Sequence, residues 1–426
     1  MRVLRSACLA ASLMLSGSML AAPAPATAPT AAAVLTSYGD IARAMYEDSL
    51  TTARALQVAV NAFLANPTPA TLTAAKNAWK AARVPYMQTE VYRFGNVAVD
   101  EWEGKVNAWP LDEGLIDYVA TSYGTTSDEN PLYTLNVIAK RQIRVGARQV
   151  DATTINANLL RNLQEAQGVE ANVATGYHAI EFLLWGQDLH GTGPGAGERP
   201  ATDFNARACT NGNCDRRAAY LRTAVELLIA DLTEMTADWA PGGKARAQLA
   251  AKGVNGGLAT ILTGIGSLSY GELAGERMKL GLILHDPEEE HDCFSDNTHN
   301  AHYYDQLGMT GIWRARYTRA NGAVMQGASL RDYTMARNAD AARRMDARMD
   351  ETLAKIKLMK DTADSGRMAY DQMIGSNNAA GNKLVQDSID ALIAQTRADE
   401  AVVAALGLKI SVEGSDSLDN PSAVGP

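Results

Sequence analysis

Residues 34–64, VLTSYGDIARAMYEDSLTTARALQVAVNAFL, carry the pattern that decides the fold class. Apolar side chains recur there every three or four positions, which predicts a helix with one apolar face rather than a strand. These side chains are Leu35, Ile41, Met45, Leu56, Val60, Phe63 and Leu64. Alanine is abundant, only 6% of residues are aromatic, and no segment alternates β-branched with polar residues. We therefore expect an all-α protein.

The helical pattern returns along the rest of the chain. It predicts helices at residues 71–93 (kinked at Pro85), 151–163, 169–185, 216–239, 245–262, 270–284, 329–361 and 368–406. Because 426 residues are too many for one ordinary core, we expect two helical-bundle-like domains, with one large helical array as the alternative. The Gly- and Pro-rich run 191–213 is the expected linker between domains at 34–190 and 214–410. Residues 411–426 are expected to form a disordered tail.

The first 22 residues have the composition of a signal peptide. Arg2 and Arg5 form a positive region, residues 7–15 form an apolar region, and small residues follow near a cleavage point. Residues 23–33, rich in Ala and Pro, are expected to form a flexible mature N-terminus. No apolar run is long enough to span a bilayer. We expect an exported, periplasmic protein without a transmembrane segment in its mature chain; membrane or surface association is left open.

The charge of the chain argues against some partners. The formal net charge is −9, and loss of Arg2 and Arg5 with the signal peptide makes it −11. An acidic surface disfavours nucleic acid as a partner and attracts cations.

Three cysteines remain after the expected cleavage. Export permits a disulfide, and the segment from Cys209 to Cys214, CTNGNC, contains an Asn-Gly turn that would bring its ends together. We expect a Cys209–Cys214 bridge and a free Cys293, with two free thiols in a loop as the alternative. Zinc binding by the pair is disfavoured because no second Cys or His pair with suitable spacing lies nearby.

An ionisable pair lies in the apolar stretch 176–190, GYHAIEFLLWGQDLH. Residues three apart on a helix are neighbours, so the Cβ atoms of His178 and Glu181 would lie about 5–6 Å apart. Such a pair can bind one metal ion, as Glu-x-x-His pairs do inside helical bundles. It can also form a plain hydrogen bond. The spacing leaves both interpretations open.

Two further segments carry polar groups in a pattern. The expected second helix has one polar stripe, made of Arg83, Tyr86, Glu90 and Arg93. Residues 106–118 then group three carboxylates beside aromatic residues, at Asp112, Glu113 and Asp117. A solvated helix face and acids at a helix start are the alternatives.

Four of the six histidines and seven carboxylates lie within residues 285–305, HDPEEEHDCFSDNTHNAHYYD. This composition would suit a hard or borderline cation. His299, His302 and Asp305 are three apart and would share one face if the segment is helical. Because the segment has no fixed ligand spacing, a hydrogen-bonded structural loop is the favoured interpretation.

Two stretches of the chain echo each other. Residues 176–190 and 271–285 share the frame Gly-x4-Glu-x8-His, although Leu273 stands where the first stretch has His178. The match indicates either an internal duplication or chance in an Ala-, Gly- and Leu-rich chain. If it is a duplication, the helices of Glu181 and Glu276 would face each other across a pseudo-two-fold interface.

These segments together resemble the imelysin-like family, the homologues of an insulin-cleaving metallopeptidase, and within it the branch of iron-regulated proteins. Residues 176–181 match its Gly-x-His-x-x-Glu signature, and the blocks 83–90, 107–113 and 271–299 are similar to further blocks of that branch. The resemblance covers residues 34–410. It implies an all-α fold of two helical-bundle-like domains with the signature at their interface. It also implies a bacterial periplasmic or surface protein tied to iron acquisition.

The resemblance makes His178 and Glu181 the expected metal ligands. The matching blocks add four candidates without an assigned role, Glu90, Asp112, Glu113 and Glu276. The expected ion is iron, with zinc as the alternative, and the expected partners are that ion and other envelope proteins of iron uptake. The expected function is therefore metal binding in bacterial iron uptake.

The alternative function is that of a metal-dependent peptidase of the imelysin type. In that case Glu181 or Glu113 would activate a metal-bound water. The chain lacks His-Glu-x-x-His, the common zinc-peptidase arrangement, which disfavours this alternative.

Overall fold

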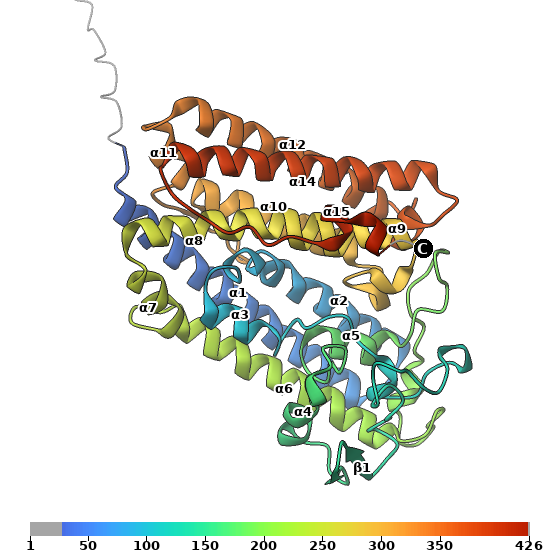
Figure 1. The fold of residues 1–426 in the computed structure, drawn as a ribbon. Coiled ribbons are helices and arrows are strands. Elements are labelled where there is room, and N and C mark those ends of the chain that lie inside the picture. The colour runs from blue at the N-terminus through green and yellow to red at the C-terminus, as the bar shows by residue number, and fades with distance from the viewer. Residues whose placement is uncertain (1–27, 425–426) are drawn as a thin grey trace, which may run out of the picture.

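The computed structural model describes residues 28–424, and it confirms the predicted all-α class. Two bundles of long helices lie against each other, and Figure 1 shows the C-terminal bundle above the N-terminal one. Among the described residues, no helix is both long and apolar enough to cross a membrane. The expected signal peptide and residues 23–27 of the expected flexible segment lie outside the described residues.

The N-terminal bundle contains α1 (Ala31–Ala65), α2 (Pro69–Met87), α5 (Gly176–Trp185) and α6 (Cys214–Asp238). The long helix predicted at 34–64 is confirmed as α1, whose N-terminus is capped by the Thr30 side chain. Helix α1 packs against α2 and α6, and α5 packs against α2 and α6. The connection between α2 and α5 holds α3 (Val97–Glu103), the antiparallel hairpin β1 (Gln142–Val145) and β2 (Arg148–Asp151), and α4 (Ala157–Leu163).

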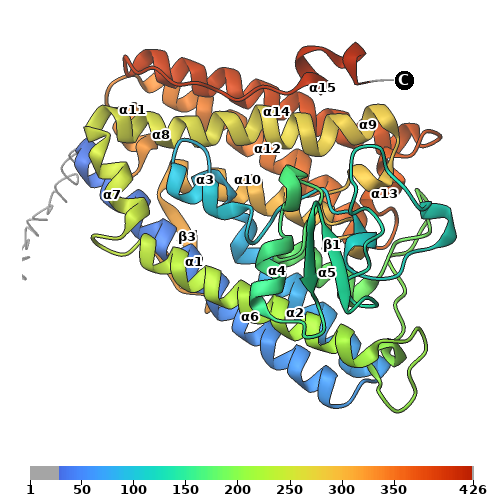
Figure 2. The ribbon, with the colours of Figure 1, turned by 60° about the horizontal axis from the view of Figure 1, so that its bottom comes forward.

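The C-terminal bundle is built on one continuous helical run. After α7 (Lys244–Ala251), helix α8 (Gly253–Ser267) continues into a π-helix, η6 (Leu268–Lys279), and then into α9 (Leu280–Leu284). Figure 2 shows α8 to α9 running beside α14. This run, α10 (Thr298–Arg314), α12 (Ala339–Asp364) and α14 (Ala379–Ala405) form the bundle. π-Helical turns are rare and are frequently found at functional sites.

Smaller elements complete the structure. They are β3 (Arg316–Thr318) paired with β4 (Val324–Gln326), α11 (Leu330–Met335), α13 (Tyr370–Ile374) and α15 (Asp416–Asp419). Short 3-10 turns are η1 (Glu90–Tyr92), η2 (Glu113–Leu115), η3 (Thr121–Tyr123), η4 (Ala166–Gly168), η5 (Ala201–Phe204), η7 (Pro287–Glu289), η8 (Cys293–Ser295) and η9 (Pro421–Ala423). Neither two-stranded hairpin was expected, because each strand is too short to give a periodic pattern.

The division between the bundles differs from the expected one. The run 191–213 was expected to separate two domains, but α6, which follows it, packs on α1 and α5 of the N-terminal bundle. The run is a loop that leads the chain back to the same bundle, and the C-terminal bundle begins at α8. A loss of periodicity marks a loop, but it does not tell which elements the loop connects.

The C-terminal tail also differs from expectation. Residues 411–424 were expected to be disordered, yet they lie along η6, where Ser415 and Ser417 are buried. The Tyr270 hydroxyl donates to Asp419 Oδ1 at 2.7 Å. Gly275 allows Ser415 to approach η6 closely, because a Cβ at residue 275 would overlap the Ser415 side chain. These contacts depend on glycines of η6, a distant segment, so the polar composition of the tail did not predict them.

Helix α5 begins later than the pattern predicts, at Gly176 rather than residue 169. Gly176 has a φ of +82°, and a Cβ there would overlap the backbone carbonyl of Val106. The next amide, of Tyr177, donates to that same carbonyl at 2.7 Å. Only glycine combines this conformation with so close a backbone approach. The contact fixes the start of α5 and hence the position of the side chains that follow.

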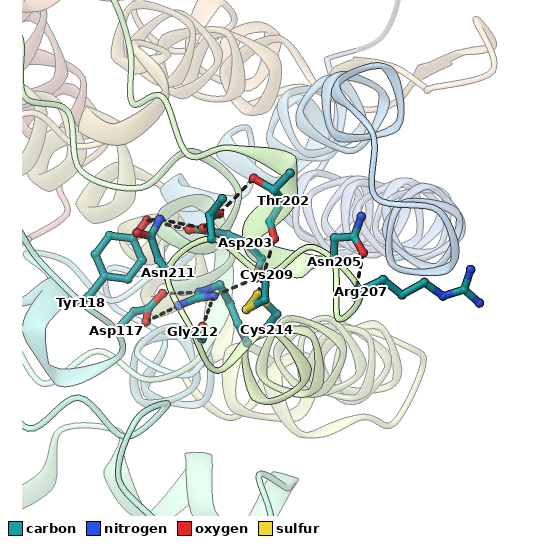
Figure 3. Close-up of a disulfide and its surroundings, with 12 residues drawn as sticks. Asp117, Tyr118, Thr202, Asp203, Asn205, Arg207, Cys209, Asn211, Gly212 and Cys214 are labelled. Carbon is teal, nitrogen blue, oxygen red and sulfur yellow. Dashed lines mark hydrogen bonds and ion pairs between the residues drawn. A yellow bond between two sulfur atoms is a disulfide. The ribbon is translucent and has the colours of Figure 1, made fainter.

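The predicted Cys209–Cys214 disulfide is confirmed, with Cα atoms 5.9 Å apart, and Cys293 is free. Figure 3 shows that the bridged loop folds over a buried ion network. The side chains of Thr210 and Asn211 each donate to Asp203 Oδ1 at 2.7 Å. In the same network, Arg217 pairs with Asp117 at 2.5 Å and donates to the Gly212 carbonyl. The disulfide therefore holds a loop whose polar atoms complete that network.

Removing the bridge should lower the stability of the fold. Closing so short a loop restricts the unfolded chain, so Cys209→Ser with Cys214→Ser should lower the free energy of unfolding by about 2 kcal/mol. Urea denaturation followed by circular dichroism measures this change. Cys293→Ser, which removes a free thiol, is the control. An unchanged urea midpoint in the double variant would show that the bridge does not stabilise the fold.

Gly176→Ala should lower the free energy of unfolding by at least about 1–3 kcal/mol, because it adds a disfavoured φ and a backbone overlap. Gly124→Ala is a matched control, since Gly124 has a φ of +87° but open space around its Cβ position. Urea denaturation of both variants separates the two contributions. Equal losses would mean that the close approach to Val106 contributes nothing.

Candidate metal centre

The signature pair lies in the interior of the molecule on α5. His178 is 1% exposed and Glu181 is fully buried. His178 Nδ1 lies 3.0 Å from Glu181 Oε2. The other ring nitrogen, Nε2, is buried and has no hydrogen-bond partner among the described residues. A buried, unpartnered ring nitrogen is costly unless something binds it.

Both members of the pair are driven toward neutrality. Burial and the nearby positive charge of Arg83 lower the pKa of His178 to about 3. Burial and the neighbouring Asp292 raise the pKa of Glu181 well above its usual range. The contact is therefore a hydrogen bond of a neutral imidazole and not an ion pair. The other carboxylate oxygen, Oε1, accepts from the Ser295 amide at 3.0 Å and its hydroxyl at 2.6 Å.

Two residues from the loop between η7 and η8 meet His178. The ring of His291 lies edge-on to that of His178, with centroids 4.7 Å apart, and Asp292 follows directly. One ligand atom from each of these three buried residues lies within 4.8 Å of the other two. Within residues 28–424, this is the one group of His, Cys, Asp or Glu side chains that meets that spacing. The α5 helix of one bundle and a loop of the other thus build a triad of two imidazoles and one carboxylate.

Arg83 on α2 holds the loop residues in place. Its Nη2 donates to Asp292 Oδ1 at 2.5 Å and to His291 Nδ1 at 3.2 Å. Its Nη1 donates to Asn107 Oδ1 at 2.5 Å. Burial alone would raise the pKa of Asp292, but Arg83 and His291 outweigh it and hold the pKa well below the usual range. Burial also lowers the pKa of His291 well below its usual value. The carboxylate is therefore ionised and both rings are neutral.

The other predicted site residues lie apart from the triad. Glu90 is buried and pairs with Arg277 at 2.8 Å. Asp112 is half-buried and accepts from Asn130, and Glu113 is buried beside Gln187 at 3.4 Å. Glu276 is exposed on η6. The structure therefore brings His178 and Glu181 together, whereas the other four predicted site residues do not contact this pair.

The histidine-rich segment has several roles. His299, His302 and Asp305 lie on α10, so this part of the segment is helical and not the loop that the sequence favoured. His285 Nδ1 lies 2.6 Å from the Ile374 carbonyl, and His299 Nε2 lies 3.1 Å from Asp364. These two contacts agree with the structural role that the sequence favoured. His291, by contrast, belongs to the triad.

Sequence reasoning did not single out His291 and Asp292. They are adjacent in a loop, so they show no helical spacing of ligands. The signal that could have found them was the block 286–299, which resembles the iron-regulated branch and holds only two histidines. They lie more than one hundred residues from His178 in the chain, so no sequence pattern links the two segments.

A cavity of about 460 Å³ leads from the surface to the triad. His291, Asn107 and Trp109 line its inner end, and the Trp109 and His291 rings have centroids 5.7 Å apart. A small ligand in this cavity would reach His291 directly. His178 and Asp292 do not line the cavity, so the triad borders it at His291.

Comparisons with known proteins place these observations in a family. The imelysin family model matches residues 42–398. Iron-regulated protein A of Synechococcus elongatus is 38% identical over 61 residues, which are 14% of this chain and 17% of that relative. The chain therefore matches well under two thirds of that relative's length.

A solved structure shares the fold. The crystal structure of an iron-regulated protein A precursor from Parabacteroides distasonis ATCC 8503 has a TM-score of 0.62. It is 17% identical in sequence, and the match covers 89% of this chain and 97% of that one. At that identity the likeness concerns the fold alone. The family model covers most of the present chain, and this chain is a member of the imelysin family.

Proposed function

We propose that the chain is an exported protein of bacterial iron uptake that binds a divalent metal ion between its two bundles. The triad of His178, His291 and Asp292 would hold the ion. The observation that carries the proposal is the convergence of three buried donor atoms within 4.8 Å of one another. The buried Nε2 of His178, which lacks a partner, supports it.

The donor set suits iron. Two imidazoles and one carboxylate form the ligand set of many non-haem Fe(II) sites, in which further coordination positions stay open. Zinc accepts the same donors, usually in a tetrahedral arrangement. The open positions would face the cavity, because His291 lines its inner end. Iron is the ion we propose, since two proteins similar to this chain are named as iron-regulated.

Glu181 is proposed to orient His178. A metal-binding histidine almost always donates its second ring nitrogen to a carboxylate or carbonyl, which fixes the ring and its tautomer. Glu181 Oε2, at 3.0 Å from His178 Nδ1, is placed for that task. The proton on Nδ1 leaves the lone pair on Nε2 free for the ion.

A metal-dependent peptidase is the second candidate, and the family model's name favours considering it. Such an enzyme needs a free base beside a metal-bound water. Both oxygens of Glu181 already have partners, His178 on one side and Ser295 on the other. Binding rather than hydrolysis is therefore the function that the contacts of Glu181 favour.

Location in the periplasm is part of the proposal. The basic and apolar start of the chain supports export. The Cys209–Cys214 disulfide supports an oxidising compartment. Envelope proteins that deliver or receive iron are the partners we propose.

Metal binding is tested by calorimetry with Fe²⁺ under anaerobic conditions and with Zn²⁺, together with metal analysis. The wild type should bind one ion per chain. His178→Ala and His291→Ala should abolish binding, because each removes a ligand, and Glu181→Gln should weaken it about 10–100-fold.

His190→Ala is the control, because His190 is exposed and outside the triad. Equal binding by the wild type and His291→Ala would contradict the proposed ligand set. Metal-dependent peptide hydrolysis that Glu181→Ala abolishes would favour the peptidase instead.

Metal affinity should fall as the pH is lowered. In the metal-free protein the raised pKa of Glu181 means that its carboxyl holds a proton to higher pH than usual. For Nε2 of His178 to bind the ion, the ring proton must lie on Nδ1. Glu181 must then be a carboxylate that accepts the hydrogen bond from Nδ1–H. Metal binding therefore releases the proton that the Glu181 carboxyl held. Affinity should therefore be highest above the raised pKa and weaken by up to about tenfold per pH unit below it.

Calorimetry in two buffers of different ionisation enthalpy measures the protons released. Glu181→Gln cannot take part in this exchange and serves as the matched variant. Binding of the wild type that is independent of pH between 5 and 8 would contradict the linkage.

A further inference from the structure

The cavity that leads to the triad has a strongly acidic wall. Six carboxylates line it against two guanidinium groups. The carboxylates are Asp100, Glu103, Glu165, Glu170, Glu272 and Glu276. The two arginines are Arg93 and Arg277. A cavity with one dominant sign of charge and low-dielectric walls concentrates ions of the opposite sign.

Both arginines are already neutralised by carboxylates. Arg93 pairs with Glu272 at 3.0 Å and with Asp100 at 3.5 Å. Arg277 pairs with Glu272 at 2.7 Å and with Glu90, outside the cavity lining, at 2.8 Å. They are therefore not free to receive an anionic ligand.

Three of the lining carboxylates remain without a partner. Glu165, Glu170 and Glu276 are exposed, and none of them forms an ion pair among residues 28–424. Two come from the segment before α5 and one from η6, so both bundles contribute to the acidic rim. We call these three residues the rim glutamates.

The inner end of the cavity points independently to a ligand. Asn107 lines it, is 2% exposed, and its Nδ2 has no hydrogen-bond partner among the described residues. The other amide atom, Oδ1, is held by Arg83, so the orientation of the amide is fixed. A buried N–H donor of this kind calls for an oxygen atom, such as that of a water or hydroxide carried by an ion.

We propose that the rim glutamates attract the metal as a free hydrated cation, and that the site is loaded with the uncomplexed ion rather than with an anionic chelate. This inference rests on the proposed metal-binding function and specifies its substrate. A hydrated divalent cation is drawn to the rim, passes the neutralised arginines, and reaches His291 at the inner end. An anionic chelate, such as a metal citrate complex, has the opposite charge and is repelled by the same carboxylates.

The test measures the association rate of Co²⁺, an air-stable divalent probe, by stopped-flow tryptophan fluorescence, with Trp109 beside His291 as the reporter. The triple variant Glu165→Gln, Glu170→Gln and Glu276→Gln removes the rim charge and keeps side-chain size. The matched control carries Glu226→Gln, Glu351→Gln and Glu400→Gln, three exposed residues that do not line this cavity.

At low ionic strength the rim variant should bind Co²⁺ about tenfold more slowly than the wild type. A tenfold change is at the low end of the effects that electrostatic steering has on association rates. Its dissociation rate should stay unchanged, and the difference should vanish at high salt, where charges are screened. The control variant should follow the wild type. When citrate is added, the rate should follow the concentration of free Co²⁺ alone.

Equal association rates for the rim variant and the wild type at low salt, with equilibrium binding intact, would overturn this inference and leave the metal-binding function standing. Faster binding from the citrate complex than from the free ion would overturn it as well. Absence of Co²⁺ binding by the wild type at equilibrium would overturn both this inference and the proposed function.

Discussion

Two buried arginines reach across the boundary between the bundles, one from each side. Arg83 on α2 of the N-terminal bundle pairs with Asp292 of the C-terminal half at 2.5 Å. Arg277 on η6 of the C-terminal bundle pairs with Glu90, which follows α2, at 2.8 Å. All four side chains are no more than 2% exposed. A buried charge without its partner is strongly destabilising, so the two bundles must dock in the register that satisfies both arginines.

The character of the metal centre follows from that docking. Arg83 places Asp292 and His291 beside His178, and its positive charge helps to keep the imidazole of His178 neutral. A neutral imidazole and an ionised carboxylate are the protonation states in which these groups bind metals. The interaction that joins the bundles thus also holds the two loop residues in place and keeps Asp292 ionised. Docking also buries Nε2 of His178 away from water, and a buried nitrogen without a partner lowers stability unless something binds it.

The helical content was predictable because it depends on local periodicity. The pattern of residues 34–64 predicts α1 almost to its ends, since one face of that helix packs against α2 and α6. The start of α5 was not predictable in this way. The apolar pattern continues back to Val169, but the contact of Gly176 with Val106 begins the helix at residue 176. The disulfide was predictable because a short turn brings its two cysteines together without the help of distant residues.

By itself the sequence determined the all-α class, the long helices, the Cys209–Cys214 bridge and the pairing of His178 with Glu181, because each depends on residues close together in the chain. Tertiary structure alone decided that His291 and Asp292 join His178, that α6 belongs to the N-terminal bundle, and that residues 411–424 lie along η6. These contacts join segments that are distant in the chain. Burial, and the need to pair Arg83 and Arg277, select them, and neither leaves a periodic trace in the sequence.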